Sequence, residues 1–296
     1  MSNTECPRMP CPGDTRVVSR SSPSLPNPVE LGRLGIVVNR ELHAGKQSRV
    51  LRGTVDGRQV VVKLTDARLA NHTTLASRMA MTESLAEMTK SVIAPIRIKD
   101  SLVHILGEWL LTATPFVSGE PADITVAADA RLLGRTLGEL HTALGRLQAW
   151  ELPPVAALVE DHGDRSRWQI VHGDFSDQNV VVTPRGLRVF DFDDCGYAPV
   201  LYDVANSLYM VLFDAEVNSN RDRYRAFRSP FLAGYADATG RSTDIGVIDA
   251  LIGARIDALG RWLDDLDRAP IGIRTSSPEW RDILRAFVAS HSHDSR

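Results

Sequence analysis

The feature that most constrains the fold is a polar stretch near the middle of the chain, DQNVVVTPRGLRVFDFD. Two short strand-like runs, 179–183 and 187–190, flank the turn residues Pro-Arg-Gly, which is the pattern of a β-hairpin. Such a hairpin folds Asn179 back toward Asp191, which lies twelve positions later in the sequence. The sequence therefore predicts that a side-chain amide and a carboxylate meet at one hairpin mouth.

A second carboxylate, Asp174, lies five residues before Asn179 in a loop that is too polar to be core. A loop residue can face the same space as the hairpin mouth without belonging to either strand. His172 follows the apolar pair Ile170-Val171, and a buried structural role is predicted for it rather than proton transfer. Each polar residue alone also fits a role as a cap or turn residue, but the three together favour a site.

The order of these residues resembles the aminoglycoside phosphotransferase and choline kinase-like superfamily, a branch of the protein kinase-like fold. Three blocks carry the resemblance: His172-Gly173-Asp174 followed by Asn179, then Asp191-Phe192-Asp193, then the segment GYAPVLYDVA at 196–205. Gly173 stands where protein kinases usually carry arginine, and no Ala-Pro-Glu element follows Asp191. Both departures favour a small-molecule kinase over a protein kinase.

The resemblance implies transfer of the γ-phosphate of ATP to a hydroxyl of a small molecule, with magnesium as the second cofactor. Asp174 would align the acceptor hydroxyl or take its proton, and His172 would brace the catalytic loop. Asn179 and Asp191 would hold Mg2+. Asp203 would cap the helix that follows and support the catalytic loop from behind.

The resemblance also implies an α+β, two-lobed protein kinase-like fold. Its small N-terminal lobe holds an antiparallel sheet and one helix, and its larger C-terminal lobe is mainly helical. We expect a disordered leader over residues 1–28, which contain many Pro and Ser and lack the apolar stretch of a signal peptide. The nucleotide-binding lobe and hinge are expected over 29–117, and the catalytic and acceptor-binding lobe over 118–296.

In the predicted small lobe, the dipeptide Asp56-Gly57 indicates a tight hairpin turn that places Lys63 at the end of Val60-Val61-Val62. Lysine is rare in this chain, since 30 of its 34 basic residues are arginine. The resemblance implies that Lys63 contacts the ATP phosphates as a point charge. The alternative is an edge-strand lysine that extends its stem along the surface.

A helix is predicted from about Leu69 to Lys90, packed on the sheet. Its carboxylates Glu83 and Glu87 are the candidates for an ion pair that would hold Lys63 over the nucleotide. Glu83 is chosen because its distance from Pro95 resembles the spacing in the family. The alternative makes both glutamates part of a solvated helix surface.

Two further nucleotide contacts are implied by the resemblance. Gly45 and Ser48 lie in a small-polar turn that would form a flap over the phosphates, although an ordinary hairpin fits equally well. The segment after the strand 109–113 resembles the hinge between the lobes, whose main chain would bind adenine. Because proline has no N–H group, Thr114 and Phe116 are the candidate residues there.

Composition bounds the class of protein. The net charge is −3, so the chain offers no broad electropositive surface for nucleic acid. Its apolar runs fall far short of the ~18 residues that indicate a membrane span. Three scattered cysteines do not make a disulfide framework, which fits a reducing compartment. We therefore expect a cytoplasmic monomer that binds a small molecule, with neither a nucleic acid nor a membrane as partner.

After Asp203 the sequence predicts a mostly helical region, which in the family binds the acceptor. Residues 201–296 carry fourteen Asp and Glu against twelve Arg, so bulk charge does not choose the acceptor. Two readings share every motif: an antibiotic-modifying phosphotransferase that confers resistance, and a metabolic kinase for a hydroxylated amine, amino acid or sugar. A nucleotide-binding regulator without turnover is disfavoured, because no residue of the implied site is missing. The acceptor hydroxyl and the preference for ATP or GTP stay open.

Overall fold

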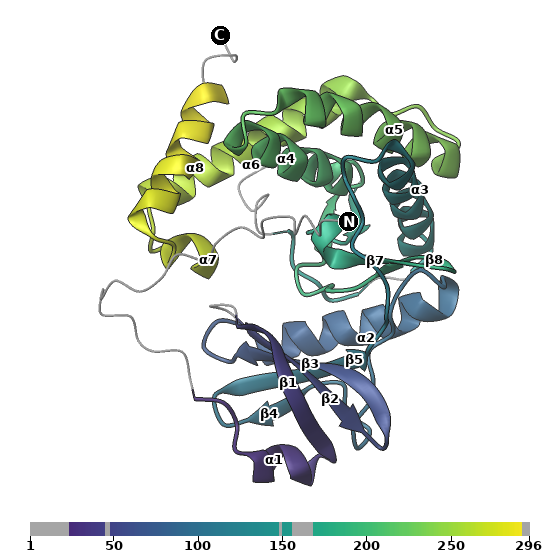
Figure 1. The fold of residues 1–296 in the computed structure, drawn as a ribbon, viewed down its shortest axis with the longest axis vertical. Coiled ribbons are helices and arrows are strands. Elements are labelled where there is room, and N and C mark those ends of the chain that lie inside the picture. The colour runs from purple at the N-terminus through teal and green to yellow at the C-terminus, as the bar shows by residue number, and fades with distance from the viewer. Residues whose placement is uncertain (1–23, 45–47, 148–149, 156–167, 292–296) are drawn as a thin grey trace, which may run out of the picture.

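The structure is a computed structural model that describes residues 24–44, 48–147, 150–155 and 168–291. Its lower part in Figure 1 is built on an antiparallel sheet with the strand order β1-β2-β3-β5-β4. The strands are β1 (Ile36–Ala44), β2 (Ser48–Val55), β3 (Arg58–Asp66), β4 (His104–Leu106) and β5 (Trp109–Pro115). Buried hydrophobic residues of the strands, together with Leu31 and Ile98, form a core of their own in this lobe.

The predicted hairpin between β2 and β3 is confirmed. Asp56 and Gly57 both have positive φ, of 49° and 74°, as a two-residue type I′ turn requires. This turn sets the register, so Lys63 lies opposite Val50 on one side and Thr112 on the other. Side chains alternate between the faces of a strand. Val62 and Leu64 are therefore buried in the core, while Lys63 points to the opposite face.

The small lobe begins before the predicted boundary. Helix α1 (Pro28–Arg33) starts with a capping box in which Asn27 and Glu30 bond each other's main-chain N–H groups. The indole N–H of Trp109 donates to the carbonyl of Ser24 at 2.8 Å. Residues 24–28 are thus folded onto the sheet, and the predicted leader is wrong for them. The rest of that leader lies outside the described residues.

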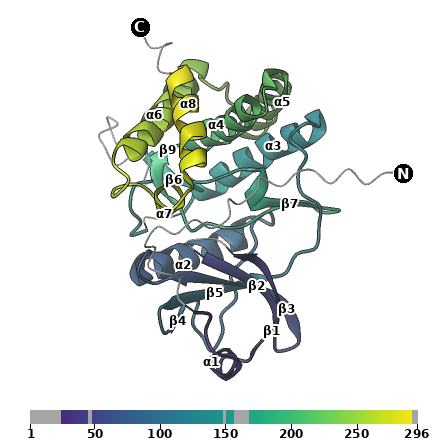
Figure 2. The same ribbon diagram turned by 60° about the vertical axis from the view of Figure 1, so that its left-hand side comes forward.

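Helix α2 (His72–Met88) lies between the sheet and the helical part of the molecule, as Figures 1 and 2 both show. Asn71 caps it by accepting from the N–H of Thr74. Its residues Leu75 and Met79 pack against the sheet lobe, whereas Met81 and Leu85 belong to the core of the larger lobe. The helix therefore joins the two lobes instead of only covering the sheet.

The larger lobe is mainly helical (Figure 2), which confirms the predicted α+β, two-lobed fold. Its helices are α3 (Ala127–Leu144), α4 (Tyr202–Val217), α5 (Arg221–Thr239), α6 (Ile245–Asp264), α7 (Ile271–Arg274) and α8 (Pro278–His291). Its strands form two ribbons, β6 (Trp168–Val171) with β9 (Gly196–Pro199), and β7 (Val180–Thr183) with β8 (Gly186–Val189). In the described part of the chain, no helix is long and apolar enough to cross a bilayer.

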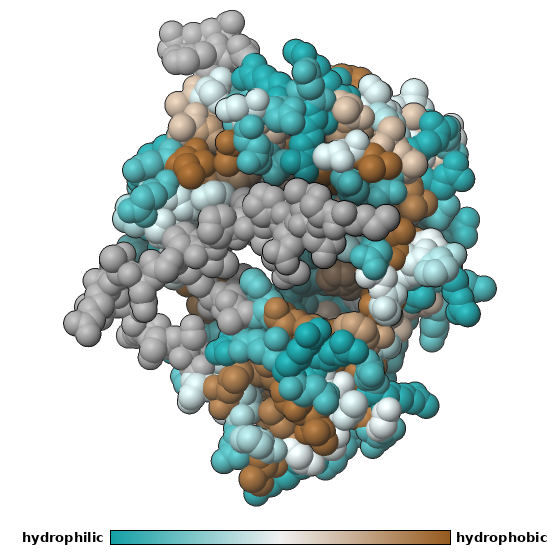
Figure 3. Space-filling model, in the orientation of Figure 1, coloured by the Kyte–Doolittle hydropathy of each residue, from teal (hydrophilic) through white to brown (hydrophobic). Residues whose placement is uncertain are grey.

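The hairpin β7–β8 is fastened to the chain that comes from the small lobe. Glu120 and Val182 exchange main-chain hydrogen bonds of 2.8 and 2.9 Å, and the N–H of Ile93 donates to the carbonyl of Val189 at 2.9 Å. Between the two lobes the molecular surface is hollowed (Figure 3). These contacts place the polar mouth of the hairpin against the lobe that carries Lys63.

Candidate active site

The lysine of the sheet and the carboxylates of the hairpin mouth meet directly. Lys63 Nζ lies 2.8 Å from both carboxylate oxygens of Asp191 and 2.9 Å from Oδ2 of Asp193. Burial alone would lower the pKa of Lys63, but the charges of Asp193 and Asp191 outweigh burial and raise it. The Lys63 ammonium therefore stays charged. Its ion pairs join the two lobes through residues that lie far apart in the sequence.

The mouth of the hairpin is closed by a main-chain contact. The N–H of Phe190 donates to the carbonyl of Asn179 at 3.0 Å, so the residue next to Asp191 is bonded to Asn179. Asp191 itself has a φ of 63°, in the left-handed region that side-chain-bearing residues rarely adopt. Such strain persists only where the surroundings hold it, and it is common at functional sites. The predicted hairpin is confirmed in both its strands and its turn.

Asp174 is held by two amides. Asn179 Nδ2 donates to the main-chain carbonyl of Asp174 at 2.8 Å and to its carboxylate at 3.1 Å, and Asn206 Nδ2 lies 3.4 Å from the other carboxylate oxygen. Burial and the negative charge of Asp194 raise the pKa of Asp174. Because the amide nitrogen of Asn179 is used in this way, its Oδ1 is the atom left to face a cation.

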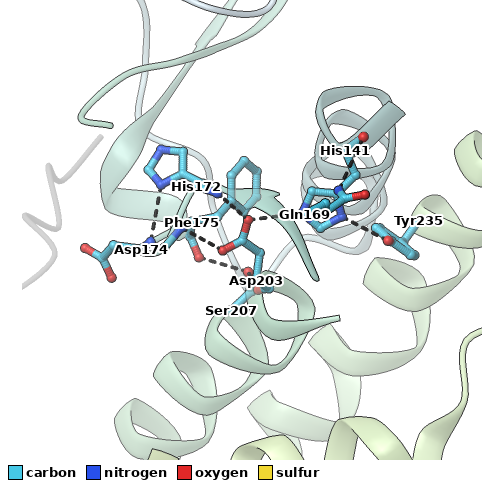
Figure 4. A network of polar contacts seen from close by, with 9 residues as sticks. His141, Gln169, His172, Asp174, Phe175, Asp203, Ser207 and Tyr235 are labelled. Atoms are coloured by element: carbon cyan, nitrogen blue, oxygen red, sulfur yellow. Dashed lines mark hydrogen bonds and ion pairs between the residues drawn. The ribbon is translucent and has the colours of Figure 1, made fainter. Parts of the chain in front are cut away.

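Residues 172–176 are called the catalytic loop here after the role predicted for Asp174, and Asp203 supports this loop from behind (Figure 4). Its carboxylate accepts from the main-chain N–H groups of His172 and Gly173 at 2.7 and 2.9 Å. The His172 ring is fully buried, and its Nε2 bonds the carbonyl of Phe190 at 3.1 Å. The predicted support is thus present, but the predicted cap is wrong, because the N-cap of α4 is Leu201 and no side chain caps this helix.

The sequence did not indicate how far this network extends. His141 on α3 donates from Nε2 to Asp203 at 3.0 Å, and its Nδ1 lies 2.9 Å from the hydroxyl of Tyr235 on α5. Burial alone would raise the pKa of Asp203, but the hydrogen bond from His141 and the charges and amides around it hold the pKa below its usual value. A buried carboxylate so well bonded fixes the catalytic loop relative to three helices.

Gly173 is required where the catalytic loop meets residues 191–195, which are called the metal loop here after the role predicted for Asp191. Its φ is 87°, and a Cβ atom built on it would lie 2.2 Å from the main-chain oxygen of Asp194. No residue with a side chain fits this approach. The glycine that stands in place of the protein-kinase arginine therefore allows two functional loops to touch.

The predicted pairing of Lys63 with Glu83 is wrong. Glu83 forms a bidentate ion pair with Arg97, with N–O distances of 2.6 and 2.8 Å, and Glu87 is exposed. The residue of α2 that reaches the metal loop is Arg78, whose Nε donates to the carbonyl of Cys195 at 2.9 Å. Glu83 comes five residues later, roughly 140° around the helix, and so faces elsewhere.

The predicted adenine contacts of Thr114 and Phe116 are also wrong. The N–H of Phe116 already donates to the carbonyl of Gln59 at 3.0 Å. Pairs in an antiparallel ladder alternate between bonded and non-bonded, so the main chain of Thr114, paired with Val61, also faces β3. The groups that face away from β3 are the carbonyl of Pro115 and the N–H of Val117. Neither is bonded within the part of the chain that the structure describes.

The two residues predicted for a phosphate flap differ in outcome. Gly45 lies outside the described residues. Ser48 is the first residue of β2, where it pairs with Thr65. Its role at the nucleotide stays a prediction.

Four residues at the site were not predicted from the sequence: Arg78, Asp193, Asn206 and Arg255. Asn206 lies on α4 and Arg255 on α6, and Arg255 Nε donates to Asn206 Oδ1 at 3.0 Å. No local pattern marks either of them, because only the packing of α4 on α6 brings them to Asp174. Asp193 could have been noticed, since it lies two residues from Asp191 in the same loop.

Comparison with known proteins agrees with this geometry. The Phosphotransferase enzyme family matches residues 145–251. Among solved structures, an amicoumacin kinase in complex with AMP-PNP, Ca2+ and Ami shares 17% identity with a TM-score of 0.68, covering 88% of this chain and 89% of that one. A microcompartment-associated aminopropanol kinase shares 15% identity with a TM-score of 0.61, covering 86% and 89%.

A spectinomycin phosphotransferase in complex with ADP and spectinomycin shares 13% identity with a TM-score of 0.56, covering 90% of this chain and 97% of that one. No sequence among the curated proteins matches the chain. The chain thus has the fold of these kinases, and the family model matches the part of the chain that carries Asp174, Asn179 and Asp191. The resemblance to the aminoglycoside phosphotransferase and choline kinase-like superfamily is thereby confirmed.

Proposed function

We propose that this protein transfers the γ-phosphoryl group of ATP to a hydroxyl of a small molecule in the space between its lobes. The observation that carries the proposal is the meeting of Lys63 Nζ with both oxygens of Asp191 at 2.8 Å. Phosphoryl transfer needs a cation on one side of the triphosphate and oxygen ligands for magnesium on the other. The two lobes supply one each at a single point.

Adenine would lie against the hinge, where the carbonyl of Pro115 and the N–H of Val117 supply one acceptor and one donor. Lys63 would then bind the phosphates. No charged side chain is needed where adenine binds, since the main-chain groups of the hinge suffice to orient a flat heterocycle.

The donor set fits magnesium. Mg2+ is commonly held by one or two carboxylates together with phosphate oxygens, so Asp191, Asn179 Oδ1 and the nucleotide would complete the site. Among the described residues there is no cluster of three or more His, Cys, Asp or Glu that could hold a metal alone, which agrees with a site shared with the nucleotide. When bound, the ion would neutralise charge on the phosphate oxygens.

Asp174 is proposed to align the acceptor hydroxyl. As the acceptor oxygen forms its bond to the γ-phosphorus, the bond to the β-phosphate oxygen breaks, ADP leaves and the hydroxyl proton passes to Asp174. Asn179 and Asn206 hold its carboxylate in one orientation. His172 and Asp203 fix the loop beneath it.

The test is ADP formation by the full chain with Mg-ATP over a panel that contains both aminoglycosides and small hydroxylated amines, amino acids and sugars. A resistance assay in a susceptible host, run beside it, separates antibiotic modification from metabolism. We propose a monomer that works in the cytoplasm, where ATP is available. ATP binding without any consumption, with or without acceptors, would contradict the proposed function and favour a regulator.

A further inference from the structure

Arg255 is the charged side chain that links the acceptor side of the larger lobe to Asp174. It lies on α6, and its Nε donates to Asn206 Oδ1 at 3.0 Å. Asn206 in turn directs its Nδ2 toward Asp174 Oδ1 at 3.4 Å. The guanidinium is therefore one side chain away from the proposed catalytic carboxylate.

The guanidinium is held in a fixed orientation by aromatic rings. Its Cζ lies 5.3 Å from the centroid of Tyr209 and 6.0 Å from that of Trp262. Cation–π contacts of this kind hold an arginine in place without using its N–H groups. Burial alone would lower the pKa of Arg255, but Tyr202 and Tyr209, followed by the more weakly acting Asp174 and Asp194, raise it, so the charge is retained.

Most of the hydrogen-bonding capacity of Arg255 remains unused. A guanidinium carries five N–H donors, and the described residues take up only the one on Nε. None of their carboxylates forms an ion pair with it, in contrast to Lys63 or Arg223. A half-buried cation is costly unless it is paired, and the two Nη groups form the planar fork that binds carboxylate or phosphate oxygens in pairs.

We propose that Arg255 binds an anionic group of the acceptor, so that the substrate is a hydroxylated acid whose hydroxyl is presented to Asp174. This inference rests on the proposed function and names its substrate class. A polycationic aminoglycoside would instead place like charge beside Arg255, in a cage of aromatic rings that the arginine already occupies. The anion would also give the half-buried guanidinium the ion-pair partner that the described carboxylates do not supply.

The first experiment measures anion binding by calorimetry, with the full chain saturated with Mg-ADP. The probes are D-glycerate and its uncharged counterpart glycerol, with inorganic phosphate as a second anion. We expect the wild type to bind glycerate more tightly than glycerol, and Arg255→Gln to weaken glycerate by at least about tenfold, as loss of a charge-assisted bidentate contact does. Arg255→Lys, which keeps the charge without the fork, should lie between the two.

The matched control is Arg268→Gln, which removes the same charge from an exposed position after α6. It should leave anion binding unchanged. Equal binding of glycerate to the wild type and Arg255→Gln, or no binding to either, overturns the inference. So does an effect of Arg268→Gln as large as that of Arg255→Gln, because a long-range field would then explain the result.

The second experiment compares acceptors that differ only in the acid group, namely L-homoserine with 3-aminopropan-1-ol and glycerate with glycerol, and adds kanamycin. ADP formation stimulated by the acids, and reduced in Arg255→Gln through a higher KM for the acid, supports the inference. Stimulation by kanamycin or by the amine alone overturns it while leaving the proposed function intact. Failure of the proposed function is recognised separately, by the absence of any ATP consumption while glycerate binding still depends on Arg255.

Discussion

Lys63 Nζ and the carboxylate of Asp191 form an ion pair of 2.8 Å although the residues are 128 positions apart in the chain. Lys63 lies on a central strand of the sheet, and Asp191 lies just beyond β8 with a left-handed backbone. The pair is the point at which a triphosphate would contact both lobes. Because each lobe contributes one of the two residues, the fold itself brings together the cation and the carboxylate that the proposed phosphoryl transfer requires.

Replacing Lys63 with alanine should lower kcat/KM for ATP by about 10² to 10³, the usual cost of removing one preorganised electrostatic contact. ADP formation and calorimetric titration with Mg-ATP measure the effect. Lys90→Ala is the control, since Lys90 is an exposed lysine just beyond α2. If Lys63→Ala and Lys90→Ala behave alike, Lys63 does not contact the nucleotide.

Asp174→Ala should lower kcat by about 10² to 10⁴, or roughly 3 to 5 kcal/mol of transition-state stabilisation, because the acceptor loses its base and orienting group. Affinity for Mg-ATP should change little, since Asn179 keeps its 2.8 Å hydrogen bond to the main-chain carbonyl of residue 174 when the carboxylate is removed. Single-turnover kinetics separates the two effects. Turnover close to that of the wild type would remove Asp174 from the mechanism.

Glu83→Gln tests the corrected position of this residue. Its ion pair with Arg97 is largely exposed, and such pairs contribute about 0 to 1 kcal/mol to stability. We expect KM for ATP and kcat to stay within about twofold of the wild type, because Glu83 has no contact with Lys63. A loss comparable to that of Lys63→Ala would show that the pair forms during turnover after all.

The sequence predicts features that local chemistry decides, and it misses features that depend on the packing of distant elements. Local chemistry sets the hairpins, since Asp56-Gly57 demands positive φ and thereby fixes the register around Lys63. The rotation of α2 was not predictable, because its apolar residues face both lobes and leave no single stripe to orient Glu83.

The prediction of the adenine contacts at the hinge was wrong for a different reason. Which main-chain groups face the nucleotide depends on the phase of the β3–β5 ladder, and a shift of one residue exchanges inward and outward groups. The sequence therefore located the hinge segment after β5, but it did not show which of its main-chain groups face away from β3. Arg255 was missed because nothing along α6 distinguishes it from other arginines until α4 packs beside it.

Asp203 should make stability depend on acidity. Its pKa is lowered in the folded protein, so its contribution to the free energy of unfolding is complete above the ordinary carboxyl value of about 4 and is lost as pH falls below it. Asp203→Asn should cost about 3 kcal/mol at pH 7, because two main-chain N–H groups and His141 lose a charged acceptor.

Urea denaturation at pH 7 and pH 3.5 measures this effect. The difference in free energy of unfolding between wild type and Asp203→Asn should narrow at the lower pH, where the carboxyl group of the unfolded chain binds protons while that of the folded protein stays ionised. Asp257→Asn, an exposed aspartate on α6, serves as the control and should show neither effect. A gap that is equal at both pH values would mean that shape, not charge, makes Asp203 important.

Gly173→Ala should impair both stability and turnover, because the added methyl group meets the Asp194 main-chain oxygen at 2.2 Å and the residue must keep a φ of 87°. A strained backbone of this kind costs about 1 to 3 kcal/mol, and relief of the clash has to move the loop that carries Asp174. Gly253→Ala on α6 is the matched control, since its added Cβ meets no atom within 4 Å and alanine favours a helix. The midpoint temperature of thermal unfolding and kcat should both fall in Gly173→Ala, and neither should fall in Gly253→Ala. If Gly173→Ala retains both, the catalytic and metal loops do not need this close approach, and the glycine would have to be explained without it.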